Sequence, residues 1–213
     1  MFAIGHFALG YLTGKSASKL LGVKLSMPLL LVASIIPDVD LILQYLDPTL
    51  FMHRGPLHSI VTFSVLMLPF IVKYRKQAIP YYVALLSHSL LGDLFTGGFE
   101  MLWPLSDRWF SLLDVSVRSV PSITVELVLC IVALIIMFKT KDLQQLLKPA
   151  SNNLFLIIAF GATIGPLLDL SKTFEASLPT PLIIPSIFWL AVLAYAILIE
   201  LRLKLRHILL RQN

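Results

Sequence analysis

Apolar stretches separated by short polar segments follow one another along the chain. A hydrocarbon core about 30 Å thick is crossed by roughly 20 apolar residues in a helix. Seven stretches approach that length, and we predict membrane spans at residues 2–21, 25–46, 57–72, 79–96, 121–138, 153–170 and 183–201. The first carries Lys15 and Lys19, so it either crosses or lies as a tilted, half-buried helix. The pattern predicts an all-α, polytopic membrane protein with about six or seven transmembrane helices.

The composition agrees with this pattern. The 213 residues are 57% hydrophobic and 14% charged, which is too apolar for an ordinary soluble domain. The net charge of +5 comes from basic residues that are confined to short loops, so it indicates a membrane protein rather than a nucleic-acid partner. Cys130 is the single cysteine, which excludes an intramolecular disulfide. The expected partner is therefore the lipid bilayer.

The basic residues also predict the orientation of the chain. Alternate connections, counted with the end of the first span and with the C-terminal tail, hold 13 of the 17 basic residues, namely Lys15, Lys19, Lys24, Lys73, Arg75, Lys76, Lys139, Lys141, Lys148, Arg202, Lys204, Arg206 and Arg211. Loops rich in lysine and arginine stay on the cytoplasmic side of a membrane. We therefore expect a multi-pass cell-membrane protein whose C-terminus is cytoplasmic.

Each of the first four predicted spans has one histidine or aspartate at a similar distance from its cytoplasmic end. His6, Asp38, His58 and His88 are each 9 to 15 residues from a lysine at the cytoplasmic boundary. At about 1.5 Å per helical residue they lie roughly 14 to 22 Å above that boundary. Ionisable groups at such depth are costly and mark functional sites. We expect the four to meet in the extracytoplasmic half of the bilayer.

Prolines interrupt the chain beside these groups. In SIIPDVD, Pro37 disfavours a continuous helix, and an extended segment would direct Asp38 and Asp40 to the same side. In HRGPLHS, residues 53–59, a proline suits the first helical position. His58 is then expected in the first turn of the third span, with His53 and Arg54 in the loop above it.

In SHSLLGDLFTGG, His88 and Asp93 are five residues apart, which does not place them on one face of a regular α-helix. Gly92 can relax the helix there; otherwise only one of the pair reaches the site. The donors at this depth are His6, Asp38, Asp40, His53, His58, His88 and Asp93. Imidazole with carboxylate suits zinc, manganese or iron. Seven donors exceed the need of one tetrahedral ion, so two ions fit, and so does one ion with surrounding orienting residues and a general base.

Five motifs in order, IGHFALGYLTG, SIIPDVD, HRGPLHS, SHSLLGDLFTGG and LWPLS, resemble the membrane-bound metal-dependent hydrolase family, also described as the LexA-regulated inner-membrane hydrolases. That family is distantly similar to zinc-dependent phospholipase C. The resemblance covers residues 1–110 and implies a helical membrane protein with metal-dependent hydrolase activity. It implies metal ligands at His6, Asp38, His58, His88 and Asp93. Many members have the last histidine and aspartate four residues apart rather than five.

The chain therefore divides into a metal-site helical membrane domain, residues 1–110, and C-terminal transmembrane helices, residues 111–213, which carry no motif that assigns a role. Glu126 and Asp169 lie in these later spans, and the sequence assigns them no role either.

The leading functional hypothesis is a phosphoesterase with one or two divalent ions, zinc first and manganese or iron as alternatives. Asp40 or His53 would act as general base or orient a ligand. Arg54 would act in catalysis and, with Arg108, hold the negative charge of the substrate. A site in the outer half of the bilayer favours a phosphorylated lipid or lipid-linked substrate, with water-soluble substrates as the alternative. An oligomer is compatible with the sequence.

Two other classes of function use the same residues. A transporter or ion-binding carrier would place a translocation site near the midplane and would have broken helices in both halves. PDVD in the first half and FGATIGPLLD in the second each contain an interruption followed by aspartate, although the second half has no matching histidines. A structural ion would instead have a closed coordination shell.

Overall fold

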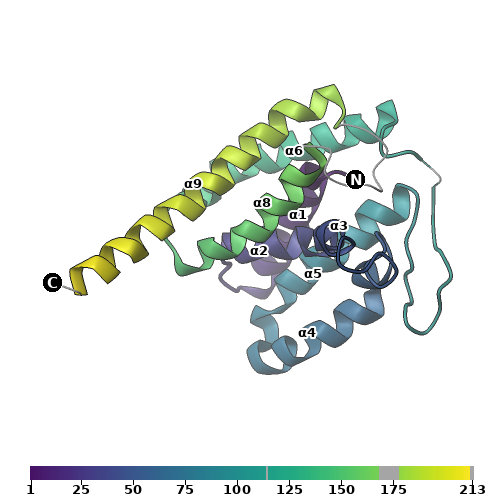
Figure 1. The fold of residues 1–213 in the computed structure, drawn as a ribbon, viewed down its shortest axis with the longest axis horizontal. Coiled ribbons are helices and arrows are strands. Elements are labelled where there is room, and N and C mark those ends of the chain that lie inside the picture. The colour runs from purple at the N-terminus through teal and green to yellow at the C-terminus, as the bar shows by residue number, and fades with distance from the viewer. Residues whose placement is uncertain (114, 168–177, 212–213) are drawn as a thin grey trace.

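The computed structural model describes residues 1–113, 115–167 and 178–211, and these are mostly helical, with a long irregular segment at residues 96–113 (Figure 1). Phe99 and Phe110 form an isolated bridge and exchange two backbone hydrogen bonds of 3.0 and 2.9 Å. No strand forms within the described ranges. The predicted all-α fold is confirmed.

Helix α1 (Ala3–Leu21) is the centre of the bundle and packs against α2 (Met27–Ile35), α5 (Ile79–Ser87) and α6 (Val120–Lys139). Its first nine residues are all buried, as expected for a helix that is apolar on every side. It ends at Gly22, whose left-handed conformation (φ 62°) lets its N–H donate to the carbonyl groups of the last turn.

The remaining elements are short except for the last. They are η1 (Ile36–Val39), α3 (Asp40–Leu43), η2 (Pro56–His58), α4 (Ile60–Tyr74), η3 (Arg75–Gln77), η4 (His88–Gly92), η5 (Asp93–Phe95), α7 (Asp142–Leu146), η6 (Ser151–Phe155), α8 (Leu156–Leu167) and α9 (Thr180–Arg211). Helices α4 and α9 lie on opposite sides of the bundle (Figure 1). Two of the predicted spans are broken helices, 25–46 after Ile35 and 79–96 after Ser87.

Two helices in the described ranges are long and apolar enough to cross a membrane. They are α6, with 20 residues, and residues 180–210 of α9, with 31. Large apolar side chains of α6, among them Val125, Val128 and Ile131, are exposed, which suits contact with lipid acyl chains. The other predicted spans are shorter, interrupted or too charged to meet the same criterion, so a total of six or seven crossings stays a prediction.

The hydrophobic core draws on both parts of the chain. Phe7 and Tyr11 of α1 are in the same buried cluster as Met137 of α6 and Trp189 of α9. Phe7 and Trp189 have ring centroids 5.4 Å apart. The N-terminal helices are therefore packed against the C-terminal ones, across the boundary that the sequence suggests near residue 110.

A polar cluster joins Tyr11 and Lys15 of α1 to Asp142, in the segment that follows α6. Asp142 accepts hydrogen bonds from Tyr11 Oη (2.8 Å) and Thr140 Oγ1 (2.7 Å), and its carboxylate lies 2.6 Å from Lys15 Nζ. Burial raises the pKa of Asp142, but these three donors lower it more, so the pKa is held below its ordinary value. Asp142 is thus ionised and paired at neutral pH.

The close approach of α1 and α2 depends on Gly10. A Cβ at Gly10 would lie 2.1 Å from the Cβ of Ser34. We predict that Gly10→Ala separates the two helices and lowers the free energy of unfolding by about 1–3 kcal/mol. Urea unfolding in detergent measures this. Gly161→Ala is the control, because its new Cβ would meet only the flexible end of Ile42, at 3.3 Å. Equal stability of both variants and wild type would contradict the predicted close packing.

Candidate metal centre

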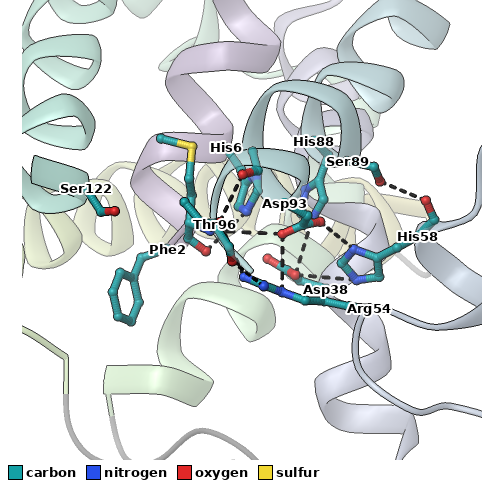
Figure 2. A network of polar contacts seen from close by, with 12 residues as sticks. Phe2, His6, Asp38, Arg54, His58, His88, Ser89, Asp93, Thr96 and Ser122 are labelled. Carbon is teal, nitrogen blue, oxygen red and sulfur yellow. Dashed lines mark hydrogen bonds and ion pairs between the residues drawn. The ribbon is translucent and has the colours of Figure 1, made fainter. Parts of the chain in front are cut away.

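Four separate segments bring histidines and carboxylates together beside α1 (Figure 2). α1 contributes His6, η1 and the start of α3 contribute Asp38 and Asp40, the loop before α4 contributes His53 and His58, and η4 with η5 contributes His88 and Asp93. All except the partly buried His53 are buried. All seven donors predicted from the sequence are therefore in one place.

The donor atoms form two groups, each compact enough to hold an ion. Those of Asp38, Asp40, His53 and His58 lie within 4.8 Å of one another. The donor atoms of His6, His88 and Asp93 also lie within 4.8 Å of one another. The groups are adjacent, since His88 Nε2 lies 3.3 Å from Asp38 Oδ1 of the first group.

Each of three buried histidines has one ring nitrogen held by an acceptor. His88 Nδ1 lies 2.8 Å from the carbonyl oxygen of Ser34, and His6 Nε2 lies 3.2 Å from that of Met1. His58 Nδ1 lies 2.7 Å from Asp93 Oδ2. These contacts fix the orientation of each ring and, where the acceptor is a carbonyl, require that nitrogen to carry the proton.

The second nitrogen of each of these rings makes no well-directed hydrogen bond in the part of the chain that the structure describes, although two of the three lie within ion-pair distance of a carboxylate. These atoms are His6 Nδ1, His58 Nε2 and His88 Nε2. His58 Nε2 lies 3.0 Å from Asp40 Oδ2, and His88 Nε2 lies 3.6 Å from Asp93 Oδ2. A buried ring nitrogen without a hydrogen bond costs free energy. In a metal-binding histidine, one ring nitrogen binds the ion and the other donates its N–H to an acceptor that fixes the ring. The residues present fit a divalent ion.

A π-helical turn aligns His88 with Asp93. The Asp93 N–H donates to the carbonyl oxygen of His88 across the π-helix η4, a spacing of five residues. This wider turn brings residues five apart to nearly the same face, which a regular α-helix does not. The five-residue spacing therefore delivers both side chains to the site.

Gly92 makes room for the histidine from α1. A Cβ at Gly92 would lie 2.5 Å from His6 Cε1. The His6 and His88 rings stack with centroids 3.5 Å apart and an angle of 10° between their planes. The glycine in the π-turn thus permits the contact between α1 and η4 that places His6 in the second group.

Two local predictions were wrong. The segment with Asp38 and Asp40 is not extended, because Pro37 is accommodated in a 3₁₀ turn that continues into α3. Both carboxylates still reach His58, whose Nε2 lies 3.8 Å from Asp38 Oδ1 and 3.0 Å from Asp40 Oδ2. His58 itself is not in the first turn of α4. It ends a separate 3₁₀ turn, because Ser59 caps α4 by accepting hydrogen bonds from the backbone N–H groups of residues 61 and 62.

Arg54 connects the histidine loop to the turn after η5. Its Nε lies 3.5 Å from Asp93 Oδ1, its Nη1 donates to the carbonyl oxygen of Thr96, and its backbone N–H donates to Asp40 Oδ2 at 3.2 Å. Arg108, in contrast, is exposed and lies over the ring of Phe110, with 5.4 Å between its Cζ and the ring centroid. The structure brings Arg54 to the cluster and places Arg108 outside it.

Several residues that support the site were not identified from the sequence. Ser34 and Met1 act through backbone carbonyl groups, which no side-chain pattern reveals. Ser89 Oγ donates to the carbonyl oxygen of His58 at 2.8 Å. Glu126 was visible as a carboxylate within an apolar span, and its contacts are described below. Asp169 lies outside the described residues.

The packing of His6 on Gly92 gives a test of the geometry. We predict that Gly92→Ala lowers the free energy of unfolding by about 1–3 kcal/mol, because the new methyl group overlaps the His6 ring. In a His6→Ala background the same substitution should cost much less, since the ring is gone. Thermal unfolding of the four proteins measures this coupling. Equal costs in the two backgrounds would contradict the contact.

The chain matches one known family. The sequence profile described as YdjM inner membrane protein matches residues 1–165, a stretch that includes every donor of the cluster and the whole of α6. No curated protein matches the chain, and no solved structure does. These comparisons support a membrane location. They do not support the predicted similarity to metal-dependent hydrolases and zinc-dependent phospholipase C. Because the match covers well over half of its length, the chain belongs to the YdjM inner membrane protein family.

Proposed function

We propose that this protein is a membrane-embedded, metal-dependent hydrolase that cleaves a phosphoester of a lipid or lipid-linked substrate. One observation carries the proposal: three buried histidines each have one ring nitrogen held by an acceptor and the other without a hydrogen bond, and in His58 and His88 that second nitrogen lies 3.0 and 3.3 Å from an aspartate oxygen. That arrangement prepares the second nitrogens to bind an ion.

The two donor groups suit two neighbouring ions. Asp38 and His58 would hold one, and His6, His88 and Asp93 the other, while Asp40 and His53 of the first group stay available as general base and orienting residue. Cys130, the single cysteine, lies on α6 and is in neither group, so the ligands are nitrogen and oxygen atoms. Such a set suits zinc, manganese or iron. When bound, the ions would acidify water and polarise a phosphoryl oxygen.

The chain supplies the remaining chemistry. His53 Nδ1 lies 3.0 Å from Asp40 Oδ1, and the His53 side chain is 14% exposed. This pair can take a proton from water in the site and pass it outward, which is the role of a general base. Arg54 neutralises Asp93 and fixes its orientation, and its guanidinium adds positive charge where a phosphate would approach. Arg108, on the outer loop, stays a predicted contact for the substrate.

Apolar side chains beside the cluster favour a lipid substrate. Ile42, Tyr45 and Leu46 follow Asp40 in the chain and are exposed by 48%, 52% and 79%. Leu91 and Phe95 flank Asp93 and are also exposed. An acyl chain could lie against these groups while its headgroup reaches the carboxylates and histidines. The proposal keeps the predicted six or seven crossings, the cytoplasmic C-terminus and the extracytoplasmic position of the site.

Metal content and hydrolysis test this function together. We predict that detergent-purified wild type contains zinc, manganese or iron, and that His58→Ala and His88→Ala lose it, because each removes a ring nitrogen that is proposed to bind the ion. Mass spectrometry measures the metal. Release of phosphate from phosphatidic acid should fall at least about 100-fold in both variants. His207→Ala, which changes an exposed residue of α9, should keep both properties.

Thermal unfolding establishes that the variants remain folded. Faster hydrolysis of p-nitrophenyl phosphate than of phosphatidic acid would favour a water-soluble substrate over a lipid. Wild type that binds no metal after incubation with each ion would contradict the hydrolase, and the same cluster would then be better assigned to transport. Metal retained by both histidine variants would contradict the site.

A further inference from the structure

Glu126 is a carboxylate buried within the membrane-spanning helix α6. Both of its oxygens lie 3.1 Å from the backbone nitrogen of Phe2, whose N–H donates to them. These contacts join residues more than 120 positions apart in the chain. Burying a carboxylate in apolar surroundings costs free energy unless hydrogen-bond donors compensate it. The donors that contact Glu126 therefore indicate its structural role.

The partners of Glu126 are at the N-terminal end of α1. The first N–H groups of a helix have no acceptor within the helix, and they carry a partial positive charge. The residue that precedes α1, Phe2, supplies no side-chain cap. Glu126 supplies the acceptor from another helix. It therefore caps α1 across the bundle.

The capped end of α1 carries a residue of the candidate metal centre. His6 is in the first turns of α1, and its backbone N–H donates to the carbonyl oxygen of Phe2 at 3.3 Å. Its ring stacks on His88 in the second donor group. A shift of the helix end along its axis would move this ring out of the group. Figure 2 shows His6 beside His88 and Asp93.

We propose that Glu126 is a positioning residue, which anchors the first turn of α1 and thereby sets the place of His6 in the second donor group. The consequence for metal binding rests on the proposed function, whereas the anchoring of α1 does not. The proposal also gives the C-terminal helices a part in the site, because α6 belongs to the portion of the chain that carries no donor of the cluster.

Amide hydrogen exchange of the metal-free protein tests the anchoring by itself. Glu126→Ala removes the acceptor, so exchange in the peptide that contains residues 2–6 should become at least about tenfold faster. Glu126→Gln keeps an acceptor oxygen and should remain close to wild type. Cys130→Ala is the matched control, one turn further along α6 and also buried. Unchanged exchange in Glu126→Ala, or equal acceleration in Cys130→Ala, would overturn the proposal.

A double-mutant cycle on zinc affinity tests the action through His6. Glu126→Ala should weaken zinc binding about tenfold in wild type and cause no further loss in His6→Ala, because the two substitutions remove the same ligand. Competition with a chelator measures the dissociation constants. An equal loss in both backgrounds would mean that Glu126 acts on stability in general and would overturn the proposal. If wild type binds no zinc, the proposed function fails, and the exchange experiment alone decides the role of Glu126.

Discussion

Seven nitrogen and oxygen donors are brought together inside an apolar helical bundle, and their need for partners determines the structure around them. A buried polar group without a hydrogen bond costs free energy, and a buried charge without compensation costs more. Here carboxylates face imidazoles, two imidazoles are fixed by backbone carbonyl groups, and Arg54 compensates Asp93. Three ring nitrogens are left without a hydrogen bond in the described part of the chain, two of them beside aspartate oxygens. The donor atoms lie close enough together to hold a metal ion, which is the basis of the proposed function.

The irregular backbone around the site follows from the same need. Regular helices would direct Asp38 and Asp40 apart, and likewise His88 and Asp93. A 3₁₀ turn at the first pair and a π-turn at the second bring each pair back to the cluster. Single π-turns occur frequently at functional sites because they reorient side chains at the cost of regular hydrogen bonding. The irregular turns therefore occur at the segments that carry the donor residues, whereas α6 and α1 are regular helices.

Much of the site could be predicted from the sequence because ionisable residues in apolar runs are few and costly. Their distances from boundary lysines predicted that His6, Asp38, His58 and His88 would meet, and the structure brings the four together, although their depth in the membrane stays a prediction. The conformations of the breaks could not be predicted, since a proline permits several, and contacts between distant segments choose among them. This explains the missed 3₁₀ turn at Asp38 and the missed cap at Ser59. The role of Glu126 depends on a pairing across the bundle that no local pattern contains. Local hydropathy also cannot give the number of membrane crossings, because the orientation of an interrupted helix in a membrane does not follow from its hydropathy.

The central claim is that imidazole and carboxylate side chains bind a divalent ion in this cluster. X-ray absorption at the edge of the bound metal tests it most directly, because it reports the ligand atoms of the ion. The account predicts a first shell of nitrogen and oxygen only, with the outer-shell scattering of at least two imidazole rings, and its loss in a protein that lacks both His58 and His88. A sulfur ligand, which only Cys130 or a methionine could supply, or a spectrum without imidazole scattering, would contradict it.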